Sequence, residues 1–248
     1  AALLGCTFSF TAHANDIFVQ RTAIRRKSKR ASFVACISEY NRTYLNKEFD
    51  VPLGKLKLVR CGVDPEQFDF TSIERREKNH ILAVGRLVEK KGFHVLLGAL
   101  SRIVPRFKGL RCEIIGDGPD RQELEALRNR LGLENIVEFC GRQPQEAIRQ
   151  KLGAATLFVL PCVLDANGDM DGIPVALMEA MASGLPVISS RISGIPELIQ
   201  DRQNGWLVEP FAESELAETI AEALEHQEDR ADFARRARET IENEFNVK

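Results

Sequence analysis

The sequence predicts an α/β fold in which parallel sheets are covered by helices on both faces. Short apolar runs rich in β-branched and aromatic residues alternate with helical patterns along nearly the whole chain. The helical patterns are long enough to serve as crossovers between parallel strands, which places helices on both faces of each sheet. The chain has 248 residues, of which 44% are hydrophobic, and this is enough for one or two ordinary domain cores.

Nine apolar runs are predicted strands, and six segments have the residue pattern of helices. In chain order the strands are Phe8–Thr11, Phe33–Ile37, Leu56–Arg60, Ile81–Val84, Arg111–Ile115, Val137–Phe139, Leu157–Leu160, Val187–Ser190 and Trp206–Val208. The helices are Phe93–Val104, Arg121–Leu131, Gln145–Leu152, Pro174–Ser183, Ser214–Glu225 and Asp229–Phe245. The opening run AALLGCTFSF lacks a basic segment and is too short to span a bilayer, so we interpret it as part of a core strand and not as a signal peptide.

The polar stretch 62–79 separates two unequal parts of the chain. Residues 73–248 have the strands and helices of a complete Rossmann-like domain. Residues 1–72 hold only about three strands, fewer than an open parallel sheet needs to bury itself. We therefore expect 1–72 to be the C-terminal part of an N-terminal Rossmann-like domain plus a linker, in a chain truncated at its N-terminus.

Charge and cysteine content exclude several classes of protein. Residues 1–64 carry an excess of positive charge and the remainder an excess of negative charge, although the net charge is only −2. The run from Arg21 to Arg30 holds six basic residues, which form either a solvated face or a contact for anionic lipid headgroups or a phosphate-bearing acceptor. Nucleic acid is disfavoured because no aromatic residue interleaves with this run. Scattered cysteines without a C-x-x-C pair indicate neither zinc nor disulfides, so we expect a cytoplasmic protein, peripheral at the inner face of the membrane if the basic run binds lipid.

The segment Asp171–Ile199 contains a carboxylate in an unusual setting. Glu179 lies in a helix that is otherwise almost wholly apolar, bounded by Pro174 at its start and by Gly184 at its end. A helix that is apolar nearly all round is buried, and a buried carboxylate requires partners. Glu179 is therefore either a buried ligand-binding group or a member of one narrow exposed strip.

Polar residues follow several predicted strands, at the edge where open α/β sheets bind ligands. Gly85 to Gly92 brackets Arg86 and Lys91 between glycines before a helix, an arrangement that suits an anion. Gly116 to Pro119 resembles a dinucleotide fingerprint, but Arg121 occupies the position of the third glycine, so an NAD site is excluded and a turn or a close approach of ligand remains.

Two further segments have alternative interpretations. The loop 162–172 is rich in aspartate, yet Met170 and Ala176 replace the glycine and glutamate of a calcium loop, so a polar loop with one or two ligand-facing residues is favoured over a metal site. His13 follows a strand and is either structural or part of a site.

Taken together and in this order, these segments resemble glycosyltransferase family 4, which has the GT-B fold of two facing Rossmann-like domains. The motifs that carry the resemblance are VGRLVEKKG (84–92), EIIGDGP (113–119), VEFCGR (137–142), DGIPVALMEAMASGLPVISS (171–190), SGIPELI (193–199) and NGWLV (204–208). FTAHANDIF (10–18) and RCGVDPEQF (60–68) are similar to the family's N-domain histidine segment and its interdomain linker.

The resemblance implies a retaining transfer of sugar from a nucleotide-diphosphate sugar to a saccharide or lipid-linked acceptor in polysaccharide or glycolipid biosynthesis, without a required metal or other cofactor. It implies that Arg86 and Lys91 hold the donor pyrophosphate and that Glu179 holds the ribose hydroxyls. Asp171, where the family usually has glutamate, and His13 become the catalytic candidates near the donor sugar. The other donor-binding candidates are Gly85, Gly118, Arg142, Gly172 and Ile173.

Two alternatives remain at this point. One is a nucleotide-sugar-binding module without activity, and the other is a sugar-nucleotide epimerase of the same fold.

Overall fold

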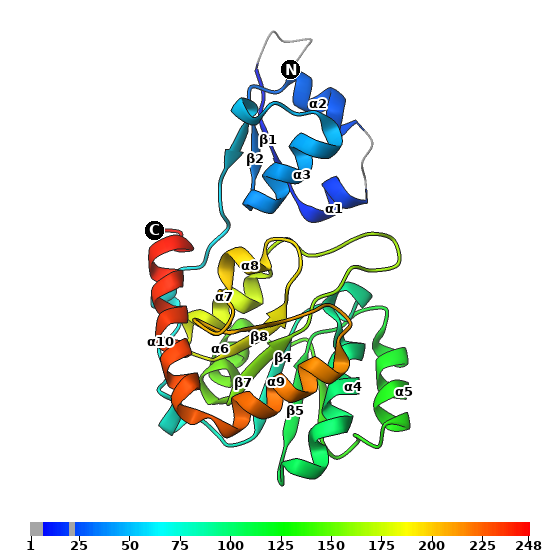
Figure 1. Cartoon of the computed structure of the whole chain (residues 1–248), viewed down its shortest axis with the longest axis vertical. Helices are drawn as coiled ribbons and strands as arrows, with labels where there is room; N and C mark the ends of the chain where they lie inside the picture. The colour runs from blue at the N-terminus through cyan, green and yellow to red at the C-terminus, as the bar shows by residue number, and fades with distance from the viewer. Residues whose placement is uncertain (1–6, 20–22) are drawn as a thin grey trace.

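The computed structural model describes residues 7–19 and 23–248, apart from the side chain of Asn15. The described residues form two parallel sheets, each with its own buried apolar cluster. The smaller cluster takes its buried residues from Ala12 to Leu56, and the larger one begins at Val63. We call residues 7–58 the small unit and residues 63–248 the large unit; Figure 1 shows them one above the other, joined by a single linker.

The small unit is a three-stranded parallel sheet with helices on it. Its strands, in the order β1-β2-β3, are β1 (Phe10–Ala12), β2 (Val34–Cys36) and β3 (Leu56–Leu58). Its helices are α1 (Ala14–Phe18), α2 (Ile24–Arg30) and α3 (Glu39–Phe49). The predicted strand at the chain start lies partly outside the described residues, and where it is described it begins later than expected, at Phe10, because residues 7–9 pair with no neighbouring strand.

The large unit is a six-stranded, all-parallel sheet of order β6-β5-β4-β7-β8-β9. Its strands are β4 (His80–Val84), β5 (Arg111–Ile115), β6 (Val137–Gly141), β7 (Leu157–Leu160), β8 (Val187–Ser190) and β9 (Trp206–Val208). Its helices are α4 (Phe93–Ile103), α5 (Arg121–Arg130), α6 (Gln145–Ala154), α7 (Val175–Ala182), α8 (Ile195–Leu198), α9 (Glu213–Glu225) and α10 (Gln227–Glu244). All nine predicted strands and the parallel arrangement are confirmed; the exact domain boundary stays a prediction.

The strand order determines where a ligand can bind. From β4 the chain proceeds outward through β5 and β6 and then returns to place β7 on the other side of β4. Open α/β sheets bind ligands at this reversal, beyond the carboxyl ends of the two central strands. In this chain the reversal lies between β4 and β7, so the loops 85–92 and 161–174 form the expected crevice.

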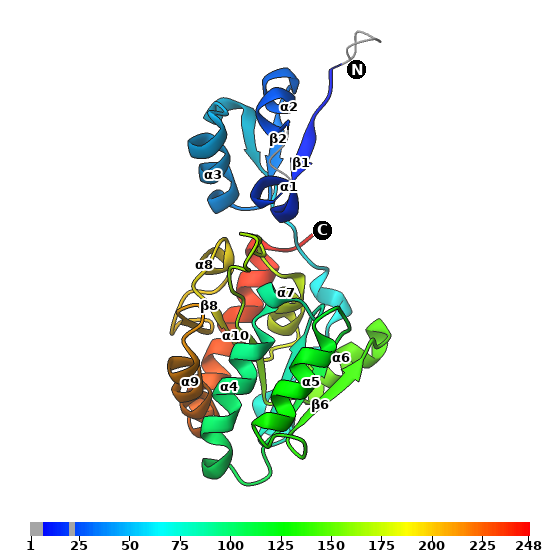
Figure 2. The same cartoon turned by 90° about the vertical axis from the view of Figure 1, so that its right-hand side faces the viewer.

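Helix α10 runs back along the large unit to the junction between the units (Figures 1 and 2). At its end Val63 and Asn246 form a short parallel bridge, so the C-terminal residues pack on the start of the large unit. The residue that follows the linker, Val63, is therefore held in place by the C-terminal residues of the chain.

Candidate functional site

The two loops at the strand reversal pack directly on one another. The backbone N–H of Val163 donates to the carbonyl of Lys90 at 2.9 Å. Gly92 has a φ of +68°, and a Cβ built on it would lie 1.8 Å from the carbonyl oxygen of Pro161. Only glycine fits both the backbone conformation and the close approach of the loops. The glycine that closes the predicted anion loop is therefore what brings Lys91 to the aspartate-rich loop.

Lys91 and Asp171 form an ion pair that joins the two loops at the strand reversal. The ammonium of Lys91 lies 2.6 Å from Asp171 Oδ2, and both side chains are about 15% exposed. Burial alone would lower the pKa of Lys91, but the adjacent Asp171 carboxylate raises that pKa above its ordinary value. Lys91 is therefore a mostly buried lysine that stays protonated, and its ammonium is paired with the carboxylate of Asp171.

Lys90 holds the rest of the aspartate-rich loop. Its ammonium lies 2.7 Å from Asp169 and 3.6 Å from Asp171. Asp165 accepts the backbone N–H groups of Asn167 and Asp169 at 2.8 Å each. Lysines and the loop's own backbone thus bind most of these carboxylate oxygens, as expected of a polar loop, although Asp169 Oδ1 is buried without a hydrogen-bond partner.

Glu179 lies on α7, half-buried, with one hydrogen bond. Gln145, the first residue of α6, donates its side-chain N–H to Glu179 Oε1 at 2.9 Å. Burial raises the pKa of the Glu179 carboxyl, against which the Gln145 bond and the charge of Arg149 act. Glu179 follows Val175, which is 47% exposed, by one turn, so both lie on the narrow, partly exposed strip of an otherwise buried helix, where the carboxylate can reach a ligand. Sequence analysis missed Gln145, although it follows a strand end, the same signal that identified Lys91.

The other donor-binding candidates on the large unit lie around these two groups with different roles. Arg86 is exposed, and Arg142 has a side chain 86% exposed with its Nε 4.0 Å from Asp117. Gly85 packs beside the aliphatic part of Lys91. A Cβ on Gly118 would lie 2.2 Å from the carbonyl oxygen of Leu87, so backbone packing alone accounts for this glycine.

Gly172 and Ile173 face the small unit. A Cβ on Gly172 would lie 2.8 Å from Ile37 Cδ1, and Ile173 is buried. His13 is exposed at the end of β1, where its backbone N–H donates to Asp16 at 3.2 Å. The structure therefore brings together Lys91 and Asp171 and places Gly172 at the contact between units, whereas the described contacts of His13 are local.

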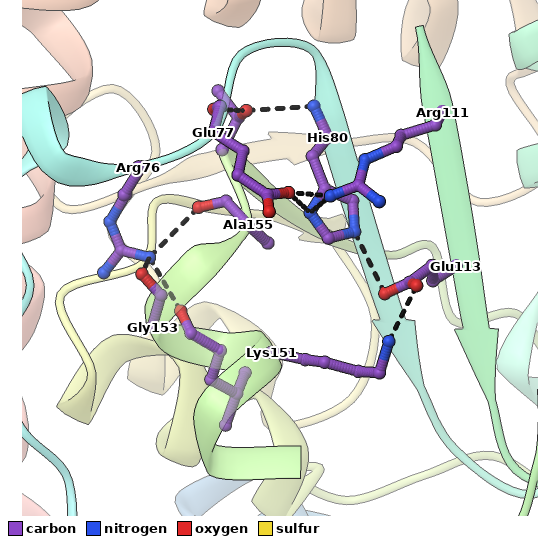
Figure 3. A network of polar contacts seen from close by, with 10 residues as sticks. Arg76, Glu77, His80, Arg111, Glu113, Lys151, Gly153 and Ala155 are labelled. Carbon is purple, nitrogen blue, oxygen red and sulfur yellow. Dashed lines mark hydrogen bonds and ion pairs between the residues drawn. The ribbon is translucent and has the colours of Figure 1, made fainter. Parts of the chain in front are cut away.

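A second polar cluster lies at the opposite end of the large sheet (Figure 3). His80, at the start of β4, lies 2.7 Å from Glu77 and 3.1 Å from Glu113, and Lys151 lies 2.7 Å from Glu113. Glu113 also comes close to Glu138 and Cys140, the one grouping of metal-ligand types that the described residues contain. Lys151 supplies the positive charge beside Glu113, while burial lowers the pKa of His80, which contacts Glu113 through a hydrogen bond, so these contacts by themselves account for the buried carboxylate.

No helix in the described part of the chain combines the length and the apolar composition that crossing a membrane requires.

Comparison with known proteins places these features in a family. Residues 64–240 match the family model described as Glycosyl transferases group 1. The Escherichia coli (strain K12) protein WcaL, provisionally named a colanic acid biosynthesis glycosyltransferase, is 40% identical over 197 residues, which cover 79% of this chain and 48% of WcaL. The amylovoran biosynthesis glycosyltransferase AmsK of Erwinia amylovora is 39% identical over 199 residues, again 79% of this chain and 48% of AmsK. The chain thus spans about half the length of these curated relatives.

Among solved structures, the Anabaena protein Alr3699/HepE, crystallised in complex with UDP and glucose, superposes with a TM-score of 0.85 at 23% identity. The match covers 99% of this chain and 69% of that chain. At this identity the likeness shows the GT-B fold alone, and it extends over both sheets of the structure.

Proposed function

The chain belongs to the glycosyl transferases group 1 family, and on this premise we propose that the intact protein transfers a sugar from a nucleotide-diphosphate sugar to a saccharide or lipid-linked acceptor. The pathway we propose is polysaccharide or glycolipid biosynthesis. The observation that carries the proposal is the Lys91–Asp171 pair at the strand reversal, 2.6 Å apart and largely shielded from water. A buried cation at the ligand-binding edge of a Rossmann-like sheet suits a diphosphate.

The proposed chemistry assigns a role to each charged group. Breaking the bond between sugar and phosphate puts negative charge on the departing diphosphate, while the sugar becomes oxocarbenium-like. Lys91, with Arg86 at the rim, stabilises that negative charge without reorganising at the moment of reaction. The diphosphate replaces Asp171 as the partner of Lys91, and Asp171 is then free to hold the donor sugar. Glu179 accepts hydrogen bonds from the ribose hydroxyls, and its present partner Gln145 yields to them.

We further propose that the reaction retains the configuration at the anomeric carbon and needs no metal. In this route the departing phosphate oxygen takes the acceptor proton on the same face, so no protein base is required. His13 lines the cleft from the small unit. Support for metal independence comes from the lysines, which already supply the positive charge that a metal would otherwise bring.

The reaction is tested in the intact protein by product analysis with UDP-, GDP- and ADP-sugars, in the presence of EDTA throughout. A new glycosidic bond of unchanged anomeric configuration is the expected product. An altered sugar still attached to its nucleotide would indicate an epimerase instead. Nucleotide binding without any product would indicate a binding module.

Replacing Glu179 by glutamine is expected to weaken nucleoside-diphosphate binding about tenfold, because hydrogen bonds to a charged group are worth about 1.5–3 kcal/mol. Binding is measured by isothermal titration with UDP, GDP and ADP. Inorganic pyrophosphate, which has no ribose, should bind the variant and the parent within about twofold. Glu146→Gln, an exposed glutamate on α6, is the control. An equal loss of affinity for pyrophosphate would exclude the ribose role.

We also propose that the basic helix α2 contacts an anionic membrane surface. Ile24 and Ser28 are its buried residues, whereas its basic side chains are all exposed, namely Arg25, Arg26, Lys27, Lys29 and Arg30. Arg25 pairs with Asp50 at 2.8 Å. Lys55 adds positive charge at the end of the helix, where it donates to the carbonyls of Ser28, Lys29 and Ala31. Arg21, part of the basic run in the sequence, lies outside the described residues.

Vesicle flotation tests this contact. Binding to vesicles containing phosphatidylglycerol should fall roughly 100-fold in the triple variant Arg26→Gln, Lys29→Gln and Arg30→Gln, since each basic residue near an anionic surface contributes about 1 kcal/mol. Vesicles of phosphatidylcholine alone should bind neither protein. The control is the double variant Lys108→Gln and Arg130→Gln, which removes two exposed cations of the large unit and should bind the vesicles as the parent does. Equal binding by the triple variant and the parent would remove the membrane role.

A further inference from the structure

A carboxylate of the large unit binds the N-terminus of a helix in the small unit. Glu197, on α8, accepts the backbone N–H of Glu39 at 2.9 Å and that of Tyr40 at 2.8 Å. Its Oε2 also lies 3.4 Å from the guanidinium of Arg60, in the linker. The Glu197 side chain is 19% exposed. One side chain thus joins the small unit, the linker and the large unit.

The physical chemistry of helix ends explains why this contact is specific. The first N–H groups of a helix have no partner within the helix, and its N-terminus carries partial positive charge. In α3 the N-cap side chain of Ser38 accepts the N–H of Asn41 at 3.0 Å, which leaves the N–H groups of Glu39 and Tyr40 without an internal acceptor. Glu197 supplies both missing acceptors from the other unit, as charge-assisted hydrogen bonds.

The surrounding surfaces are shaped for close approach. A Cβ on Gly194 would lie 2.9 Å from Cβ of Ser38, and one on Gly172 would lie 2.8 Å from Ile37 Cδ1. Both glycines therefore allow the start of α3 to rest against the large unit. Gly172 follows Asp171 directly, so the contact meets the loop that carries the proposed donor site. Asn41, fully buried in the first turn of α3, lies about 3.9 Å from the same Cβ position.

We propose that Glu197 is a positioning residue, which fixes the small unit over the loop of Asp171 and so sets the geometry between donor and acceptor. This inference rests on the proposed function for its catalytic consequence, but not for the contact itself. Glu197 touches no reacting atom. It acts through α3, and its loss should affect the chemical step more than nucleotide binding.

Hydrogen exchange tests the contact independently of activity. In Glu197→Ala the amides of Glu39 and Tyr40 should exchange about tenfold faster, because two charge-assisted hydrogen bonds are lost. Glu197→Gln keeps the side-chain length and one acceptor oxygen, so its exchange rates should lie between those of the parent and of Glu197→Ala. Glu218→Gln, an ion-paired glutamate of the large unit that does not reach the small unit, is the control. Unchanged exchange in both Glu197 variants would overturn the proposal.

Kinetics of the intact protein test the positioning role. Glu197→Ala should lower kcat about 10- to 100-fold, as small misplacements of reacting groups do, while the UDP or GDP dissociation constant stays within about threefold of the parent. Glu197→Gln should recover part of kcat. If exchange accelerates but kcat is unchanged in an active protein, the positioning role is wrong. If the parent itself makes no product, the proposed function fails, and faster exchange would still support the contact.

Discussion

Replacing Lys91 by alanine in the intact protein should reduce turnover about 10²–10³-fold, the usual cost of removing one preorganised group that stabilises developing negative charge. The structure strengthens this expectation, because Lys91 is a shielded cation held between the two loops at the strand reversal. Arg86 lies at the exposed rim and cannot replace it at the same position. Turnover is measured as sugar transfer at saturating donor, with folding checked by thermal melting.

A second variant separates charge from packing. Lys91→Met keeps most of the aliphatic chain that packs beside Gly85 but removes the ammonium, and it should lose as much turnover as Lys91→Ala. Lys108→Ala, an exposed lysine of the same unit, should behave as the parent. Turnover of either Lys91 variant within twofold of the parent would refute the assignment of Lys91 to the diphosphate.

The large sheet could be predicted from sequence because its strands are short and almost wholly buried, with apolar residues at most of their positions. Arg111–Ile115, Leu157–Leu160, Val187–Ser190 and Trp206–Val208 are found at the predicted bounds. Each is buried on both faces by flanking helices, so no alternating pattern is needed to recognise it. The end of α7 was also predictable, since Gly184 takes a φ of +68° directly after the helix.

Helix α3 was not predicted, and the reason is physical. Its buried face consists of Asn41, Leu45 and Phe49, so a polar residue occupies a position where helical spacing expects an apolar one. Asn41 shares the buried face of α3 with Leu45 and Phe49, and its side chain also lies close to Gly172 of the large unit. The same contact gives Glu197 its role, and residues 39 and 197 are 158 positions apart. No local pattern reports such a pairing.

The candidate site shows the same division between local and distant information. A strand end identified Lys91, an otherwise apolar helix identified Glu179, and the family resemblance singled out Asp171 within its aspartate-rich loop. Their partners required the fold: Asp171 for Lys91 across 80 positions, and Gln145 for Glu179 across 34. Sequence analysis thus predicts which groups carry charge at the ligand edge, whereas the structure determines which charges neutralise one another before a ligand binds.

Arg76 binds the C-terminal ends of α6 and α7, the helices that carry Gln145 and Glu179. Figure 3 shows its contacts with Gly153 and Ala155. Its guanidinium donates to the carbonyls of Leu152 at 2.7 Å, Gly153 at 3.3 Å and Ala155 at 3.0 Å, at the end of α6. It also donates to the carbonyl of Ser183 at 2.7 Å, at the end of α7. Burial lowers the pKa of Arg76 to about 10, so the side chain remains charged at neutral pH.

Replacing Arg76 by methionine should lower the free energy of unfolding by about 3 kcal/mol, measured by urea denaturation. Exchanging a buried ion pair for apolar residues can be neutral, because both charges leave together. Here the partners are main-chain carbonyls at helix C-termini, which no side-chain change removes. The carbonyl of Ser183 also accepts the backbone N–H of Thr71, but burying the others unpaired costs about 1–3 kcal/mol each before relaxation. Arg75→Met, at the exposed neighbouring position, should change stability by less than about 0.5 kcal/mol. Equal midpoints for both variants would mean that water reaches these carbonyls and that Arg76 is dispensable for anchoring the two helices.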